Sequence, residues 1–357
     1  MVITEAAPAV TARAKVKGGG LGRFILWRAL LIIPTVFILV TMVFLLMRTL
    51  GNPISASVGD RLPPAELAKR VAEAGYDRPL IVQYLEYLGQ IFTGNFGVTF
   101  SDRRPVTEVL VTFGAATLEL AVYTLIVALV VGIPLGILAA YYRDRGPDAV
   151  LRVFAIFTYA TPVFFSGLIM KLIFGVWLGW FPVSGRASIA TELQLQTLAN
   201  PSGIYLVDAI RTGSLANVGD VLSHAVLPAL TLGMMTAGIF LRLVRTNMIG
   251  TIGREYIDSG RSRGVGEYRL ATKHAFRPAL IPIITVIGLQ IAMLLGGAVL
   301  TETTFEWKGL GFQLAHYLSA RDFVAVQGIV ALLAVIVALS NFIVDVVAAL
   351  IDPRVRY

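Results

Sequence analysis

Six long apolar runs, separated by polar stretches, set the pattern of this 357-residue chain. Five of the runs contain no Asp, Glu, Lys or Arg, and the third contains only Lys171. Because roughly 20 residues of helix cross the hydrocarbon core of a bilayer, each run predicts a transmembrane helix. The runs lack the alternation of a membrane β-barrel. With the flanking residues that belong to each helix, some of them charged, the predicted spans are 23–48, 114–142, 152–180, 221–245, 278–301 and 323–347.

Composition supports a membrane protein. Apolar residues make up 56% of the chain and charged residues 15%, against about 25% charged in an ordinary soluble domain. This balance excludes a disordered chain and argues against a soluble enzyme. The chain has no cysteine and three histidines, so cysteine catalysis, disulfides and cysteine metal sites are excluded. The sequence thus predicts an all-α integral membrane protein embedded in a lipid bilayer.

The basic residues predict the orientation. If the amino and carboxyl termini are cytoplasmic, 18 of the 30 Lys and Arg residues lie on the inner side. Another 11 lie outside, and Lys171 lies within a span. This asymmetry follows the positive-inside rule. It also accounts for the basic character of the chain without nucleic-acid binding.

The segments outside the spans differ in character. Residues 1–22 and 351–357 are expected to be cytoplasmic tails, the first of them mobile. Residues 49–113 predict a small extracytoplasmic domain with two short helices. The first follows Pro63-Pro64 and ends near Gly75. The second begins at an Asp77 cap with Pro79 in its first turn. These helices either lie on the membrane surface or form a rim that receives a partner or substrate.

Two further outer segments give weaker signals. Residues 181–220 are rich in Ser, Thr, Gly and Asn and show little periodicity. Residues 302–322 contain four aromatic side chains, which predict an interfacial belt in preference to a partner surface. These aromatic residues are Phe305, Trp307, Phe312 and Tyr317.

Ionisable residues fall near the ends of the spans. Glu119, Lys171, His224 and Asp345 are each placed where the side chain can reach an interface by snorkelling or a small tilt. No charge lies at a predicted bilayer centre, where a proton relay or a sodium site is expected. The pattern argues against an ion-coupled carrier.

The inner loop 246–277 is regular enough to contain short helices. Tyr256 and Ile257 are expected on one helical face, and Gly264 and Gly266 interrupt the helix. A second basic amphipathic piece follows and leads into the fifth span. From charge alone, the loop is equally suited to anionic lipid or to a cytoplasmic protein.

No site for nucleotide or enzymatic chemistry is recognisable. A P-loop requires a Gly-Lys pair, and the sequence contains none. Histidines at metal-binding spacing and a nucleophile elbow are also missing. We therefore expect no cofactor or metal in this chain, and an intramembrane enzyme or a passive scaffold remains only as a rival hypothesis. If transport is driven, the motor is another polypeptide; the ATP and magnesium of such a motor are implied only by the family resemblance given next.

Several motifs together resemble the B-type permease subunit of the dipeptide/oligopeptide family of ABC importers. The resemblance extends from about Arg23 to Tyr357. It rests on the order and spacing of motifs at 94–97, 104–106, 224–229, 241–248, 255–264, 274–282, 302–311 and 352–354.

This resemblance implies a type I ABC importer permease fold and a set of partners. A homologous second permease, two cytoplasmic ATP-binding subunits and an extracytoplasmic substrate-binding protein are expected. The substrate is expected to be a dipeptide or oligopeptide, with a nickel chelate, glutathione or another small solute as the alternative. The location is the bacterial cytoplasmic membrane.

The family's cytoplasmic Glu-Ala-Ala motif is degenerate in this chain. Asp258-Ser259-Gly260 occupies its position, and Gly264 follows at the expected spacing. The resemblance implies that this loop docks on the ATPases, with Gly264 allowing a tight turn and close packing. The candidate coupling residues are Glu255, Tyr256, Asp258, Ser259, Gly260, Arg261, Arg263 and Gly264.

Overall fold

The computed structural model describes residues 21–52, 54–55 and 63–351, so the predicted tails fall almost wholly outside it. The described residues are mainly helical, and the β contact among them is an isolated bridge between Val98 and Pro105. The elements are α1 (Leu21–Thr49), α3 (Pro64–Glu73), α4 (Leu80–Phe92), α5 (Val106–Tyr141), α6 (Gly146–Ala160), α7 (Val163–Met170), the π-helical η2 (Lys171–Trp177), α8 (Ile189–Gln196), α9 (Tyr205–Arg211), α10 (Leu215–Ile252), α11 (Glu255–Ser262), α12 (Glu267–Arg269), the π-helical η3 (Leu270–Ala275), α13 (Phe276–Thr304), α14 (Leu310–Ser319) and α15 (Phe323–Ile351).

Four described helices are long and apolar enough to cross a membrane: α1, α5, α10 and most of α15. Helix α6 and the segment α7–η2 form a bent pair, which adds a fifth span if the two are counted as one span. The remaining predicted span falls on α13, which is 29 residues long. The prediction of an all-helical membrane protein is confirmed. The number of six spans and the side of the membrane on which the termini lie stay predictions.

The predicted span at 152–180 is sharply bent in the structure. Helix α6 ends at Ala160, α7 begins at Val163, and the two segments meet at an angle of 103°. Thr161 and Pro162 between them have extended backbone, with ψ of 127° and 134°. Proline disfavours a helical conformation in the residue before it and has no amide hydrogen to donate. The corner is therefore local to this dipeptide.

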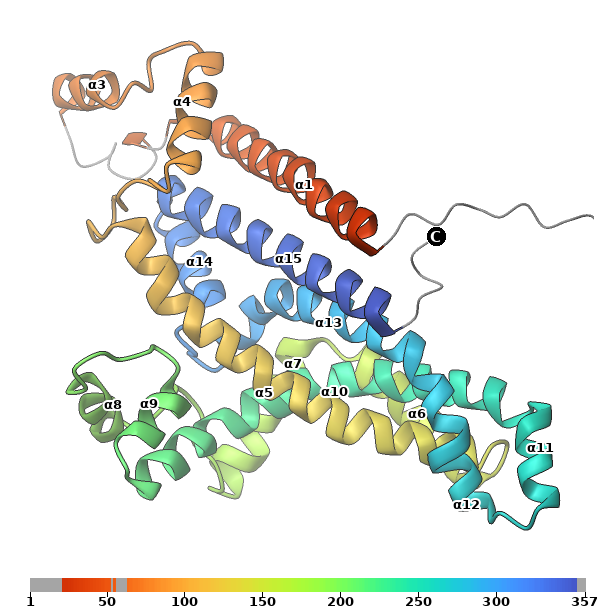
Figure 1. Ribbon diagram of the computed structural model, residues 1–357. Coiled ribbons are helices and arrows are strands. Elements are labelled where there is room, and N and C mark those ends of the chain that lie inside the picture. Colours follow the sequence, from red (N-terminus) through yellow and green to blue (C-terminus); the bar gives the residue numbers. More distant parts are fainter. Residues whose placement is uncertain (1–20, 53, 56–62, 352–357) are drawn as a thin grey trace, which may run out of the picture.

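Helices α5 and α10 form the centre of the fold, where they pack along much of their length (Figure 1). Small residues allow this close approach. A Cβ atom added to Gly132 would lie 2.7 Å from the Ala237 carbonyl oxygen, and one added to Gly136 would lie 2.6 Å from Val244 Cβ. Such small-residue contacts replace the hydrophobic driving force that lipid does not supply.

Helix α1 lies beside α15 at the edge of the molecule (Figure 1). Its most apolar window is only 11% buried, which suits a helix that faces lipid or another subunit. Val40 and Phe44 are its buried residues, and Arg28 pairs with Asp345 at 3.2 Å. The predicted position of Asp345 near a span end is thus compatible with its half-buried ion pair.

The short helices gather at two ends of the molecule. Helices α3, α4, α8 and α9 lie at one end, called here the α4 end, and α11 and α12 lie at the other, the α11 end (Figure 1). Helix α1 begins, and α15 ends, on the side of the molecule that faces away from α4 and toward α11 (Figure 1). In the predicted topology, the two tails share a side with the loop 246–277.

At the α4 end, α3 begins directly after Pro63, and Gly75 beyond it has a φ of +73°. The predicted Asp77 cap is wrong, since Pro79 is the N-cap of α4. Helix α5 begins at Val106, not at residue 114, because Pro105 presets the first turn.

Residues 181–220 are more ordered than their weak periodicity predicts. They contain α8, α9 and the start of α10. The hydroxyls of Ser188 and Ser214 cap α8 and α10 by accepting hydrogen bonds from Thr191 N and Asn217 N.

Candidate functional site

Helix α11 contains most of the candidate coupling residues. Glu255 and Asp258 lie in its first turn and Arg261 in its last, which complements the helix dipole. Gly264 has a φ of +81°, and its amide donates to the Arg261 carbonyl at 3.0 Å. The Val265 amide donates to the Gly260 carbonyl at 3.1 Å. Together these bonds form a Schellman motif, which ends the helix sharply.

One face of α11 is anchored in the core. Ile257 is 1% exposed and belongs to a cluster that includes Met248 of α10 and Leu270 of η3. Burial of one such side chain stabilises by about 1.5–3 kcal/mol. A Cβ atom on Gly260 would lie 2.8 Å from Leu270 Cδ2, so the backbone of α11 approaches η3 closely. Packing against α10 and η3 therefore holds α11 in place.

The other face of α11 is exposed and charged. Arg261 Nη1 donates to Asp258 at 2.5 Å, and Arg261 Nε donates to Glu267 of α12 at 2.5 Å. Hydrogen bonding from Arg261 lowers the pKa of Glu267 from its ordinary value. Exposed pairs of this kind contribute little to stability because water screens them. They orient side chains, whereas the buried face supplies most of the stability.

The predicted coupling residues are brought together on α11 and its C-terminal turn. Seven are exposed, and Gly260 is half-buried. Two local predictions are wrong. Tyr256 and Ile257 do not share an environment, since Tyr256 is 47% exposed and Ile257 is buried. Close packing within the chain was predicted at Gly264 but is found at Gly260, because no atom lies within 4 Å of a Cβ added to Gly264.

A buried ion pair lies at the start of α6. Asp148 is 0% exposed and accepts two hydrogen bonds from Arg245 of α10, at 2.6 and 2.7 Å. Arg152 adds a weaker contact to Asp148 at 3.8 Å. This bidentate pair ties α6 to α10. The pair was not predicted from the sequence, where the available signal is weak: opposite charges at the same predicted side of two spans.

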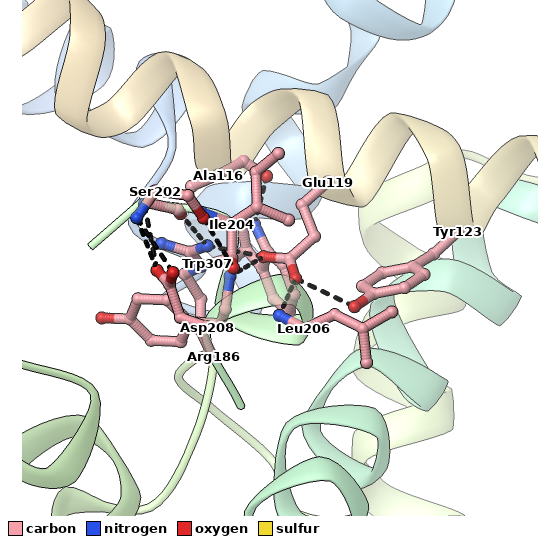
Figure 2. Close-up of polar contacts among 11 residues, drawn as sticks. Ala116, Glu119, Tyr123, Arg186, Ser202, Ile204, Leu206, Asp208 and Trp307 are labelled. Carbon is pink, nitrogen blue, oxygen red and sulfur yellow. Dashed lines mark hydrogen bonds and ion pairs between the residues drawn. The ribbon is translucent and has the colours of Figure 1, made fainter. Parts of the chain in front are cut away.

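A second group of buried polar residues occupies the α4 end (Figure 2). Glu119 of α5 is 3% exposed, and its carboxylate accepts from Arg186 Nη2 at 2.5 Å and from Tyr123 Oη at 2.9 Å. The amides of Tyr205 and Leu206 also donate to it, at 3.3 and 2.8 Å. The prediction that Glu119 reaches an interface is wrong, because these four donors replace water.

Two more acidic side chains are buried and accept hydrogen bonds from distant segments, as Glu119 does. Glu302 of α13 is 0% exposed and accepts from Thr117 Oγ1 at 2.7 Å and from the Phe312 amide at 2.8 Å. Asp322 accepts from the amides of Phe100 and Ser101 at 2.6 and 2.8 Å. Each carboxylate therefore fixes backbone from a segment distant in sequence, and neither was identified from the pattern of apolar runs.

Lys171 and His224 are also held internally. Lys171 Nζ donates to the Thr304 carbonyl at 2.8 Å, and His224 Nδ1 lies 2.8 Å from the Asp220 carbonyl oxygen. His224 is 9% exposed. Both side chains therefore have partners within the protein.

The predicted aromatic belt at residues 302–322 is also wrong for three of its four members. Phe305, Trp307 and Tyr317 are each at most 1% exposed, and Phe312 is half-buried. Trp307 Nε1 donates to the Ala116 carbonyl at 2.9 Å, and Tyr317 Oη donates to Asp102 at 3.1 Å. These rings close the packing between α5, α13 and α14. Among the described residues, no group of three or more His, Asp or Glu is placed to hold a metal ion.

Comparison with protein families gives two matches. The family described as a binding-protein-dependent transport system inner membrane component matches residues 132–357. The family described as the N-terminal part of a binding-protein-dependent transport system membrane component matches residues 21–121. Together they cover nearly the whole described chain.

Curated relatives extend over the full length. The dipeptide transport system permease protein DppB of Escherichia coli (strain K12) is 37% identical over 338 residues, covering 94% of this chain and 99% of that protein. The di/tripeptide transport system permease protein DppB of Pseudomonas aeruginosa is 36% identical, covering 94% and 98%. The glutathione transport system permease protein GsiC of Salmonella choleraesuis is 32% identical, covering 94% and 99%.

A solved structure supports the fold. A chain of the MetNI methionine ABC transporter in an inward-facing form matches with a TM-score of 0.51 and 18% identity. The match covers 70% of this chain and 98% of that chain. At this identity the similarity concerns the fold alone.

Proposed function

The chain belongs to the family of binding-protein-dependent transport system inner membrane components, and on this premise we propose that it imports dipeptides or other short peptides as one permease subunit of an ABC transporter. It is a multi-pass protein of the bacterial cytoplasmic membrane. The permease contributes half of the translocation path, and a homologous permease contributes the other half.

The observation that carries this proposal is the structure of α11. It is a short helix with an exposed charged face, and its opposite face is anchored by Ile257 and by the contact between Gly260 and Leu270. A helix held in this way transmits a push to α10 and η3 with little local deformation. It suits docking to a cytoplasmic ATPase better than adsorption to lipid, because the exposed face carries both acids and bases.

The mechanism follows from this geometry. Two ATP-binding subunits bind and hydrolyse ATP with magnesium, and their closure displaces α11. Because α11 is packed against α10 and η3 continues into α13, the displacement reaches two long core helices. Movement of those helices switches the path between outward and inward access, while an extracytoplasmic binding protein delivers the peptide. The described ion pairs and hydrogen bonds of Glu119, Glu302 and Asp148 occupy these acids, so no ion-coupled step is assigned to them.

The preference for peptides rests on the relatives. The relatives named for dipeptides are 36–37% identical, and the relative named for glutathione is 32% identical over a similar length. Glutathione and nickel chelates remain the alternative substrates.

Reconstitution of the purified complex tests the proposal. The chain should copurify with a second permease and ATPase subunits, and dialanine-loaded binding protein should stimulate ATP hydrolysis and dialanine uptake. Glutathione and nickel-histidine serve as competitors of dialanine. If one of them stimulates ATP hydrolysis and dialanine does not, the substrate is reassigned to that solute. Accumulation of dialanine against a gradient by this chain alone in vesicles would contradict an ATPase-driven mechanism.

A further inference from the structure

Residues 181–214, called here the arm, connect η2 to α10 at the α4 end and contain α8 and α9. The arm is long, yet it contacts three separate parts of the core. Its Ser188 amide donates to Asp220 of α10 at 2.8 Å, and its Gly185 amide donates to the Phe305 carbonyl at 3.0 Å. The third contact, to α5, runs through Arg186 and Glu119.

Arg186 joins these contacts at one point (Figure 2). Its Nη2 donates to Glu119 at 2.5 Å and to the Gly203 carbonyl, on the other side of the arm, at 2.7 Å. The guanidinium carbon lies 3.6 Å from the ring centre of Tyr205 and 5.6 Å from that of Trp307. One side chain thus links α5, both sides of the arm and the turn between α13 and α14.

Burial makes this link stiff. The side chains of Arg186 and Glu119 are 6% and 2% exposed, so water is poorly placed to replace either partner. Charge-assisted hydrogen bonds are strengthened where water is excluded, and a buried charge that loses its partner is strongly destabilised. The other ion pair of the arm differs, since the Arg211 side chain is 44% exposed and contacts only Asp208 and Asn200 within the arm.

We propose that Arg186 and Glu119 are positioning residues that make the arm, α5 and the α13–α14 turn move as one body. A load placed on the arm by the external binding protein then reaches α5 and α13 without being absorbed by bending of the arm. This inference rests on the proposed function, because the load comes from the binding protein. Neither residue contacts substrate in this role.

Two measurements on the purified complex test this role. The first is the distance distribution between spin labels at Val111→Cys on α5 and Gln196→Cys on α8. Both positions are exposed, and the chain has no other cysteine to react with the label. The second is the stimulation of ATP hydrolysis by dialanine-loaded binding protein, relative to the basal rate.

The variants are Arg186→Gln and the double variant Glu119→Gln with Arg186→Gln, which leaves no lone buried charge if the single variant fails to fold. Arg211→Gln is the matched control. We expect both test variants to broaden the distance distribution and to reduce stimulation by about fivefold or more, the lower range of coupling between sites. The basal rate and copurification of subunits should stay unchanged, and Arg211→Gln should match the parent.

Unchanged stimulation in a folded double variant overturns the positioning role, whether or not the distance distribution broadens. An unchanged distance distribution overturns it as well. Failure of the proposed function is distinguishable, because the parent complex itself would then show no stimulation by the loaded binding protein. In that event the label distances alone still decide whether the pair fixes the arm.

Discussion

Substitution of Gly260 by valine is expected to loosen α11 without removing any charge from its exposed face. The first added carbon would lie 2.8 Å from Leu270 Cδ2, closer than carbon atoms approach in proteins. Leu270 is 2% exposed and lies in the cluster that also buries Ile257 and Ala271, so its displacement disturbs the packing of that cluster. Relief of the clash therefore moves Leu270 out of its place in the cluster, moves α11 away from η3, or does both, and each of these loosens the anchor.

The magnitude follows from two opposing effects. Overpacking in a filled core costs about 1–3 kcal/mol. Replacement of glycine by valine inside a helix recovers roughly 0.4 kcal/mol of helix propensity. The net destabilisation of the α11 anchor is therefore about 0.6–2.6 kcal/mol, which raises the population with α11 detached by roughly 3- to 80-fold.

Limited trypsin cleavage measures this population. Arg261 and Arg263 are exposed residues of α11 and its cap, and cleavage at them requires local opening of the helix. The cleavage rate of Gly260→Val in the purified complex should rise by the factor given above, and peptide uptake should fall. Gly253→Val is the matched control, because Gly253 has a φ of −81° and its nearest neighbour would lie 4.0 Å from a Cβ.

Two results would refute this reasoning. One is a Gly260→Val complex with normal cleavage and normal uptake, which would show that the contact with Leu270 does not hold α11. The other is lost uptake with an unchanged cleavage rate, which would show that Gly260 acts by direct contact with a partner and not through the anchor.

Three further outcomes are expected. Gly264→Trp should abolish uptake while the protein stays in the membrane, because a φ of +81° disfavours any L side chain. Transport assays and immunoblotting measure the two properties, and Gly264→Asn should have a milder effect. Normal uptake by the Trp variant would contradict a coupling role. Arg245→Gln should lower stability by about 1.5–3 kcal/mol because buried Asp148 loses its bidentate partner and keeps only Arg152 and the Asp144 amide, and thermal unfolding should show that adding Asp148→Asn restores part of the loss; no difference between the single and double variants would argue against the pair. Trp307→Phe should cost about 0.5–1.5 kcal/mol through loss of the indole hydrogen bond to the Ala116 carbonyl, whereas exposed Trp177→Phe should leave the melting temperature nearly unchanged; equal effects would be evidence against the buried hydrogen bond.

The apolar runs predict the helices well because membrane helices satisfy all their backbone hydrogen bonds within one segment. The same reasoning fails at Pro162, where apolarity continues but the backbone turns by 103°. Hydropathy reports the medium that surrounds a residue and carries no information on chain direction. The proline was the available signal, and its effect on the preceding residue could have suggested the break.

The buried acids were misread for a related reason. A charge near the end of a span is compatible with snorkelling and with burial, and spacing along the chain does not distinguish them. Glu119 can be buried because its carboxylate pairs with Arg186, which lies 67 residues later in the chain, and accepts hydrogen bonds from two backbone amides of the arm. Such pairing depends on tertiary contacts. Within α11, by contrast, charge spacing and Gly264 were sufficient to predict a short helix that ends in a tight turn.

The corner between α6 and α7 has a consequence for what surrounds this chain. The Phe157 carbonyl accepts from the amide and hydroxyl of Thr161, but the carbonyls after it in α6 and the first amides of α7 have no partner within their own helix, and Pro162 is exposed. Hydrocarbon cannot solvate such groups, so irregular backbone at membrane depth survives only against protein or water. Within the predicted span 152–180, we therefore expect this corner to be covered by a neighbouring polypeptide or by water in an aqueous lumen, and not by fatty acyl chains.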